Sequence, residues 1–176
     1  MKQTAGQKIN CEISAIQKNS KDVMAVKSVN FSCHGLLKYL LQYIHHYLYF
    51  KKHGDNEREK LMLDIIFSTM RHIEKLENLM LSLGVNPVFI KSALSGDCIY
   101  KASFKHTAEK MLVDDVAAKL IIVRLLKTTA KKVFSDRVRE VIYSIAAEEE
   151  RQLKELENSF KKLRGENCVK LVGLSV

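Results

Sequence analysis

Residues that break helices are scarce in this sequence, whose 176 residues include one proline and seven glycines. Proline costs about 3 kcal/mol inside a helix and glycine about 1 kcal/mol, so their scarcity favours long helices. Residues 1–10 lack the apolar run of a secretory signal, and the most apolar stretch, residues 35–50, contains Lys38, His45 and His46. That stretch is also too short to cross a bilayer. We therefore expect no membrane segment and a cytoplasmic location.

Several motifs of known chemistry are also missing. The four cysteines lie far apart, and none belongs to a Cys-x-x-Cys pair: Cys11, Cys33, Cys98 and Cys168. This spacing argues against a zinc site or a disulfide framework and predicts reduced thiols. The sequence contains no phosphate-binding loop and no nucleophile elbow. What is present, 47% hydrophobic and 28% charged residues, is typical of a globular chain with a single core.

The charge of the chain is unevenly distributed. The formal net charge is +9, and residues 1–29 and 161–176 each carry a net +3, so two-thirds of the excess lies near the two ends. Basic ends attract polyanions in general, but no recognisable nucleic-acid-binding motif accompanies them. We expect a flexible basic tail over residues 1–29, a folded domain over residues 30–164, a second tail over residues 165–176, and no specific binding of nucleic acid.

Apolar residues recur at helical spacing in four blocks. They predict helices over about residues 33–52, 56–83, 107–132 and 136–164. Ser32 is expected to cap the first helix, and Gly165 is expected to end the last. The third block is apolar nearly all round, which predicts the most buried helix of the four.

The connections between these blocks predict the topology. Few residues link the first helix to the second and the third to the fourth, so each pair is expected to form an antiparallel hairpin. Roughly 20 residues, 85–106, link the second helix to the third, and at about 3.3 Å per residue they reach farther than the roughly 40 Å length of the second helix. The sequence therefore predicts an all-α four-helix bundle in which a long crossover joins two antiparallel hairpins.

Polar residues interrupt the apolar faces of three of these helices. They are Thr69 and His72 in the second, Lys119 in the third, and Glu149 and Gln152 in the fourth. An unpaired buried charge is costly, so Lys119 and Glu149 either pair with each other or reach solvent. A single histidine on an apolar face is more often a hydrogen-bonded core residue than a metal ligand, and both interpretations stay open for His72. The adjacent His45 and His46 point about 100° apart, and we expect them at an aromatic rim.

Four segments resemble the helices of the ferritin-like superfamily. Residues 68–87 resemble its second helix, in which a Glu-x-x-His motif precedes a Leu-Gly-x-x-Pro ending, and they are most similar to the manganese-catalase-like, rubrerythrin and bacterioferritin branches. Residues 36–43, 114–119 and 146–157 resemble the first, third and fourth helices. The resemblance covers residues 30–162 and implies a ferritin-like bundle with a two-metal centre.

The same resemblance implies that most of this metal centre has been lost. In the family, a Glu from each of two helices and a Glu-x-x-His from each of the other two hold the metals. Residue by residue, the chain keeps His72 and Glu149 and replaces the other ligands: Leu36, Thr69, Lys119 and Gln152. Two ligands hold at most one weakly bound Mn, Fe or Zn ion, so we expect no cofactor. Lys119 is expected to replace a metal beside Glu149, with Glu148 and Tyr43 next to the site.

The sequence therefore predicts a non-enzymatic structural or interaction protein that forms a dimer or larger homo-oligomer, or that partners an intact paralogue. The alternative is a manganese- or iron-dependent oxidoreductase of catalase or ferroxidase type with atypical ligands. Acids that would complete its site are Asp64, Asp114, Asp115 or Glu148. A second alternative is binding of nucleic acid or another polyanion through the basic tails, for which a steep salt dependence would be diagnostic.

Overall fold

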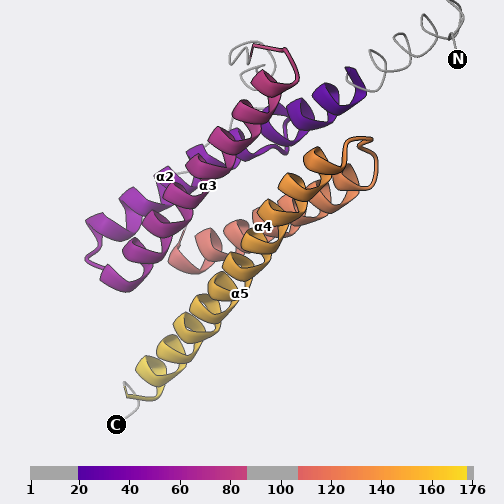
Figure 1. The fold of residues 1–176 in the computed structure, drawn as a ribbon. Helices are drawn as coiled ribbons and strands as arrows, with labels where there is room; N and C mark the ends of the chain where they lie inside the picture. Colours follow the sequence, from indigo (N-terminus) through magenta and orange to yellow (C-terminus); the bar gives the residue numbers. More distant parts are fainter. Residues whose placement is uncertain (1–19, 87–106, 174–176) are drawn as a thin grey trace, which may run out of the picture.

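The computed structural model describes residues 20–86 and 107–173, with side-chain burial as far as Gly165. Four helices form the bundle: α2 (Leu36–Lys52), α3 (Asn56–Ser82), α4 (Ala108–Ala130) and α5 (Asp136–Gly173) (Figure 1). A shorter helical segment, residues 20–31, precedes α2. The described ranges contain no strand, and the predicted all-α class is confirmed.

The helix starts follow from local chemistry. Asp55 precedes α3, and its carboxylate accepts the backbone N–H of Arg58 at 3.1 Å. Thr107 precedes α4, and its hydroxyl accepts the backbone N–H of Lys110 at 3.2 Å. Such caps satisfy N–H groups that have no partner within the helix. Gly54, at φ 69°, supplies the left-handed conformation that lets the chain reverse between α2 and α3.

The arrangement is that of two antiparallel hairpins. α2 packs against α3 and α4 against α5, while α2 also contacts α4 and α3 contacts α5. Figure 1 shows that α4 begins at the end of the bundle where α2 turns into α3, and that α3 ends where α4 turns into α5. The link between α3 and α4 therefore joins opposite ends of the bundle, as the predicted crossover requires.

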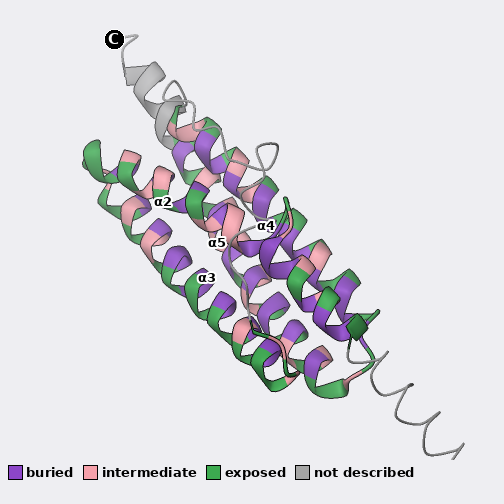
Figure 2. Ribbon diagram, turned by 90° about the horizontal axis from the view of Figure 1, so that it is seen from above, coloured by how far each residue is buried: buried purple, intermediate pink, exposed green. Residues whose placement is uncertain are grey.

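The apolar stripes of the four helices meet inside the bundle (Figure 2). Large side chains that are fully buried come from every helix: Leu36, Phe50, Met62, Leu76, Leu112, Ile122, Ile142 and Leu156. Burying one such side chain stabilises the fold by about 1.5–3 kcal/mol. This packed surround holds the polar residues of the interior in fixed positions.

The N-terminal helical segment corrects the expected domain boundary. The sequence predicts a tail that includes residues 20–29, but Val23, Val26 and Val29 recur at helical spacing and are buried. Asp22 is buried as well, and its carboxylate accepts the backbone N–H groups of residues 134 and 135 at 2.8 and 2.9 Å. This contact ties the segment to the turn before α5. The rest of the expected tail, residues 1–19, lies outside the described residues.

Glycine marks the close approach of this segment to α2. A Cβ atom on Gly35 would lie 2.7 Å from the carbonyl oxygen of Asn30, so only glycine fits there without a shift of backbone. Gly35 is also the residue that precedes α2, in place of the expected cap at Ser32. The Ser32 hydroxyl instead accepts the backbone N–H of His34.

Two further expectations are wrong. α5 continues through Gly165 to Gly173, because one glycine costs a helix only about 1 kcal/mol and does not have to end it. Cys33 is disulfide-bonded, whereas the sequence predicts reduced thiols. The spacing of cysteines along the chain does not reveal which of them meet in space.

No helix in the described ranges is long and apolar enough to cross a membrane.

Candidate functional site

Three helices direct polar side chains into the middle of the bundle. Thr69 and His72 lie three residues apart on α3, as Glu149 and Gln152 do on α5, so each pair shares a helix face. Lys119 projects from α4 between them, and all five side chains are buried. The polar interruptions seen in the sequence therefore meet at one place.

The ammonium group of Lys119 is held by three neighbours. Its Nζ atom lies 2.5 Å from Oε2 of Glu149 and donates to Oε1 of Gln152 at 2.6 Å. It also lies 4.9 Å from the ring centroid of Tyr43, at cation–π distance. The ammonium therefore makes two hydrogen bonds and one cation–π contact. Of the two outcomes that the sequence left open for Lys119 and Glu149, pairing or exposure to solvent, the structure has pairing.

His72 lies between two carboxylates. Its Nδ1 atom is 2.8 Å from Oε1 of Glu149, and its Nε2 atom is 3.0 Å from Oε2 of Glu148. Both ring nitrogens of His72 are therefore within hydrogen-bond distance of a carboxylate oxygen. Ser68 donates to the other oxygen of Glu148 at 2.5 Å. Glu148, which the resemblance places next to the site, thus lies beside His72.

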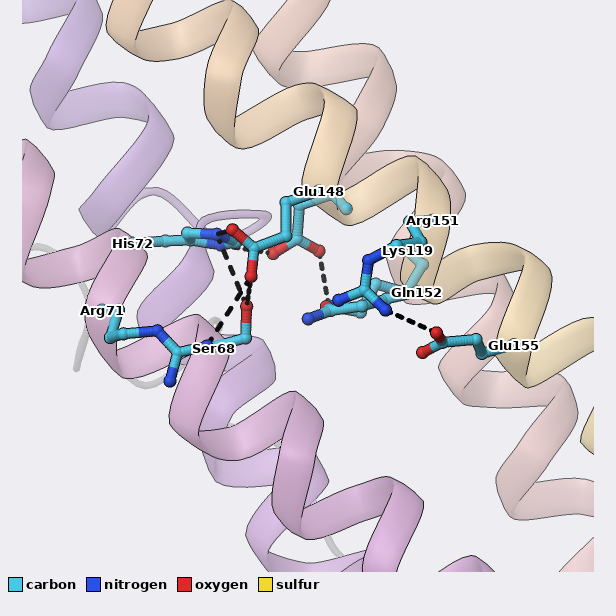
Figure 3. A network of polar contacts seen from close by, with 9 residues as sticks. Ser68, Arg71, His72, Lys119, Glu148, Arg151, Gln152 and Glu155 are labelled. Atoms are coloured by element: carbon cyan, nitrogen blue, oxygen red, sulfur yellow. Dashed lines mark hydrogen bonds and ion pairs between the residues drawn. The ribbon is translucent and has the colours of Figure 1, made fainter.

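These contacts form one continuous set, the ion network, defined as Ser68, His72, Lys119, Glu148, Glu149 and Gln152 (Figure 3). The Glu149 carboxylate contacts both the Lys119 ammonium and the His72 ring, and the Glu148 carboxylate contacts the His72 ring. Burial raises the pKa of the Glu149 carboxyl, but the charge of Lys119 and the hydrogen bond from His72 outweigh burial and hold this pKa below its usual range. For Glu148, burial is outweighed by hydrogen bonds from Ser68 and His72, and the pKa falls to about 2.

At the remaining positions of the expected metal centre, Leu36 and Thr69, the side chains contribute no contact to the ion network. Leu36 is fully buried among apolar side chains. Thr69 is fully buried too, and its hydroxyl has no hydrogen-bond partner in the part of the chain that the structure describes. The same is true of the Tyr43 hydroxyl. Burial, followed by the charges of Glu149 and Asp115, raises the pKa of Tyr43 well above its ordinary value, so the phenol stays protonated.

A second buried polar group, the α2–α4 cluster, consists of Gln42, His46 and Asp115. Nδ1 of His46 lies 2.8 Å from the Asp115 carboxylate, to which Gln42 donates at 2.9 Å. Burial raises the pKa of Asp115, although His46 and Gln42 act to lower it. His46 is fully buried, so its expected place at a rim is wrong. Two features of the sequence could have indicated this cluster. Gln42 and His46 lie one turn apart on the first helix, and Asp115 interrupts the apolar stripe of the third predicted helix.

The acids of the oxidoreductase alternative do not gather at Glu149. Asp64 is exposed, and Asp114 forms an ion pair of 2.5 Å with Lys110 on its own helix. Asp115 belongs to the α2–α4 cluster, and only Glu148 lies in the ion network. Across the described residues, no group of three or more His, Cys, Asp or Glu side chains is arranged to hold a metal ion.

Solvent reaches the edge of the ion network. A pocket of about 330 Å³ between α3 and α5 is lined by residues that include Ser68, Arg71, Arg151 and Gln152. Figure 3 shows the two arginine side chains on either side of the network, with Arg71 directed toward Glu148 and Arg151 toward Glu155. Ser68 and Gln152 thus line this pocket, although both residues are buried.

Comparison with known proteins identifies the family of this bundle. The family model of the ferritin-like domain matches residues 30–165, which is more than half of the chain. The match spans all three helices that build the ion network. No curated protein matches the sequence.

Proposed function

Because the chain belongs to the ferritin-like family, we propose that it is a non-enzymatic structural or interaction protein whose two-metal centre has been replaced by the ion network. The observation that carries the proposal is the position of Lys119, whose Nζ atom lies 2.5 Å from Glu149 and 2.6 Å from Gln152 with all three side chains buried. An ammonium there neutralises the carboxylate that a metal would otherwise use, and it repels a second cation. The motif at residues 68–87 favours a descent from the manganese-catalase-like, rubrerythrin or bacterioferritin branch.

The donor set does not fit the two-metal centre that the family implies. Leu36 has no donor atom, and Thr69 offers a neutral hydroxyl in place of a carboxylate. A metal at His72 needs a ring nitrogen with a free lone pair, and here each ring nitrogen already lies within 3.0 Å of a carboxylate oxygen. The chemistry of the residues thus supports loss of the centre, and we derive no catalytic step through a metal.

A weaker version of the alternative would place one Mn, Fe or Zn ion on His72 and Glu149. This ion would have to displace Lys119 from Glu149, which leaves an ammonium buried without its partner. The same displacement would be needed for an oxidoreductase with atypical ligands. Both alternatives therefore predict metal in the purified protein, whereas the proposal predicts none.

Metal content is the measurement that tests the proposal. The protein is purified without chelator, reconstituted with Mn(II) or Fe(II), and analysed by inorganic mass spectrometry. We expect close to no metal per chain. A positive control is the variant Leu36→Glu/Thr69→Glu/Lys119→Glu/Gln152→His, which restores the four missing ligands and is expected to bind metal. One or two ions per wild-type chain, lost in Glu149→Ala, would overturn the proposal.

The proposal includes association as the way in which the protein acts, either with further copies of itself or with an intact paralogue. Cytoplasmic location is part of it, although the disulfide at Cys33 argues for an oxidising compartment, because cytoplasmic thiols are kept reduced. Alkylation of free thiols in intact cells, followed by mass spectrometry, distinguishes the two locations. Polyanion binding by the basic tails stays a second candidate, and loss of binding on removal of residues 1–19 would support it.

A further inference from the structure

A groove between α3 and α5 lies at the end of the bundle where α5 begins. Its volume of about 350 Å³ is typical of sites for small molecules. The residues that line it are two bases, an amide, a hydroxyl and two aliphatic side chains: Lys75, Arg137, Asn78, Ser144, Leu79 and Val141. No acidic residue of the described chain lines this groove, which we call the basic groove.

The basic groove differs in charge from two other grooves along the same pair of helices. The pocket beside the ion network is lined by Asp64 and Glu155 as well as by arginines. A third groove is lined by Glu57 together with the same two acids. Arg151 pairs with Glu155. Lys162 pairs with Glu57. Acids of the protein itself therefore balance positive charge in those two grooves.

The two cations of the basic groove have no such partner. Within the described ranges, neither Lys75 nor Arg137 forms an ion pair with an acid. Asp136 is next to Arg137 in the chain but pairs with Arg139. Lys75 acts on Glu148 electrostatically, but the hydrogen bonds and ion pairs of that carboxylate are made by other residues. An anion from solution can therefore supply the charge that the wall of the groove lacks.

The two cations lie at opposite ends of the basic groove. α5 begins at the end of the bundle where α3 ends, so the two helices are antiparallel, and the contact of His72 with Glu148 fixes their alignment (Figure 1). Lys75 is therefore level with Ser144, which is seven residues, or about 10 Å, along α5 from Arg137. Side chains on a helix lean toward its N-terminus, so those of Lys75 and Arg137 diverge. The two aliphatic side chains lie between them.

We propose that the basic groove binds an elongated dianion, a small organic molecule with an acidic group at each end and an apolar chain between. One acidic group pairs with Lys75 and accepts a hydrogen bond from Ser144. The other pairs with Arg137, whose guanidinium fits a carboxylate or a phosphate in a fork. The apolar chain covers the aliphatic side chains. No residue of the ion network lines the basic groove, so this ligand site is independent of the metal centre and its loss.

The length and charge of the ligand test the proposal on the unmodified protein. Isothermal titration calorimetry is done at low ionic strength, because salt screens exposed charges. Suberate is compared with succinate, which is too short to reach both cations, and with octanoate, which has an equally long chain but one acidic group. Suberate is expected to bind at least about 10-fold more tightly than either, because only suberate makes charge-assisted hydrogen bonds at both ends. Equal affinities for the three ligands, or no binding of suberate, would overturn the proposal.

The kind of acidic group is identified in the same way. An alkane bisphosphonate of the same length as suberate is titrated under the same conditions. Tighter binding of the bisphosphonate assigns the site to phosphate groups, and tighter binding of suberate assigns it to carboxylates. Either result supports an elongated dianion, whereas failure of both to bind would contradict it.

Variants locate the site in the basic groove. Arg137→Ala removes one cation, so the advantage of suberate over octanoate is expected to disappear. Lys75→Met is expected to have the same effect. The matched control is Arg124→Ala, because Arg124 is an exposed residue of α4 that does not line the groove. Circular dichroism verifies that all three variants fold.

Two results with these variants would place the ligand elsewhere and overturn the proposal. One is an unchanged advantage of suberate in Arg137→Ala and in Lys75→Met. The other is an equal loss of that advantage in the control Arg124→Ala. Metal content is measured separately, so metal in the purified protein would overturn only the proposed function and would leave the dianion site standing.

Discussion

The ion network and the α2–α4 cluster share a helix, since Lys119 and Asp115 lie one turn apart on α4. Each contains a carboxylate that is removed from water, yet the two carboxylates respond in opposite ways. Burial raises the pKa of Asp115, whose closest partners are a histidine and an amide. Burial also acts to raise the pKa of Glu149, but the ammonium of Lys119 reverses the outcome. A fixed cation at hydrogen-bond distance is thus the feature that separates the two sites.

The difference has a consequence for stability. The ion network depends on matched charges, so removal of one member leaves another buried without a counter-charge. The α2–α4 cluster depends more on hydrogen bonds around one acid, so a neutral residue of the same shape is better tolerated there. Substitutions in the ion network and in the α2–α4 cluster are therefore expected to change the stability by different amounts and with a different dependence on pH.

The largest effect is expected for Lys119→Met, which leaves Glu149 buried with only His72 to balance it. Loss of one member of a buried ion pair typically destabilises a protein by about 3–5 kcal/mol. The double variant Lys119→Met/Glu149→Gln removes both charges, and its free energy of unfolding in urea is expected to lie close to that of the wild type. Additive effects of the two single substitutions would contradict the coupling.

A smaller loss of stability is expected for Asp115→Asn. This substitution keeps the shape of the side chain but removes one hydrogen-bond acceptor from Gln42 and His46. An unsatisfied buried hydrogen-bonding group costs about 1–3 kcal/mol. The control is Asp114→Asn next to it, because Asp114 pairs with the exposed Lys110 and surface pairs contribute about 0–1 kcal/mol. Thermal unfolding of the two variants makes the comparison. An equal loss in both would contradict the structural role of the α2–α4 cluster.

Acid is expected to weaken the ion network while it favours the α2–α4 cluster. The pKa of Glu148 in the folded protein, about 2, lies below its ordinary value of 4.5, so its stabilising contribution is present above pH 4.5 and is lost as the pH falls toward 2. The pKa of Asp115 is shifted in the opposite direction, upward. Its contribution to the free energy of unfolding is therefore present at low pH and decreases as the pH rises through the pKa of the folded state. Urea unfolding between pH 5 and pH 2 is expected to show a smaller acid loss in Glu148→Gln than in the wild type.

The smallest effect is expected for Ser68→Ala, which removes the hydroxyl that donates to Glu148 at 2.5 Å. One hydrogen bond contributes about 1 kcal/mol, and Glu148 keeps its contact with His72. The pKa of Glu148 is expected to rise, because a donor to its ionised form is lost. Nuclear magnetic resonance titration of the Glu148 side chain measures this change. An unchanged pKa would contradict the hydrogen bond as one of its causes.

Local patterns predicted a large part of the site as well as of the fold. The stripe positions placed Lys119 and Glu149 on apolar faces, and the cost of an unpaired charge limited the outcomes to pairing or exposure to solvent. The same approach missed the α2–α4 cluster, because Gln42 and His46 sit at the edge of an aromatic stripe and gave no indication of a partner on α4. It also missed the burial of Asp22, whose backbone partners lie in a turn more than a hundred residues away.

The sequence by itself determined that this protein is a bundle of long helices in two hairpins, and that a lysine and a glutamate lie on apolar helix faces, where they either pair or reach solvent. Both follow from helical periodicity and from the length of the connections, which are properties of nearby residues. Only the tertiary structure decided that His72 lies between two carboxylates, that Asp115 receives Gln42 and His46, and that the valines of residues 20–31 join the core. Those outcomes depend on how far each helix is rotated and shifted against its neighbours, which no local pattern specifies.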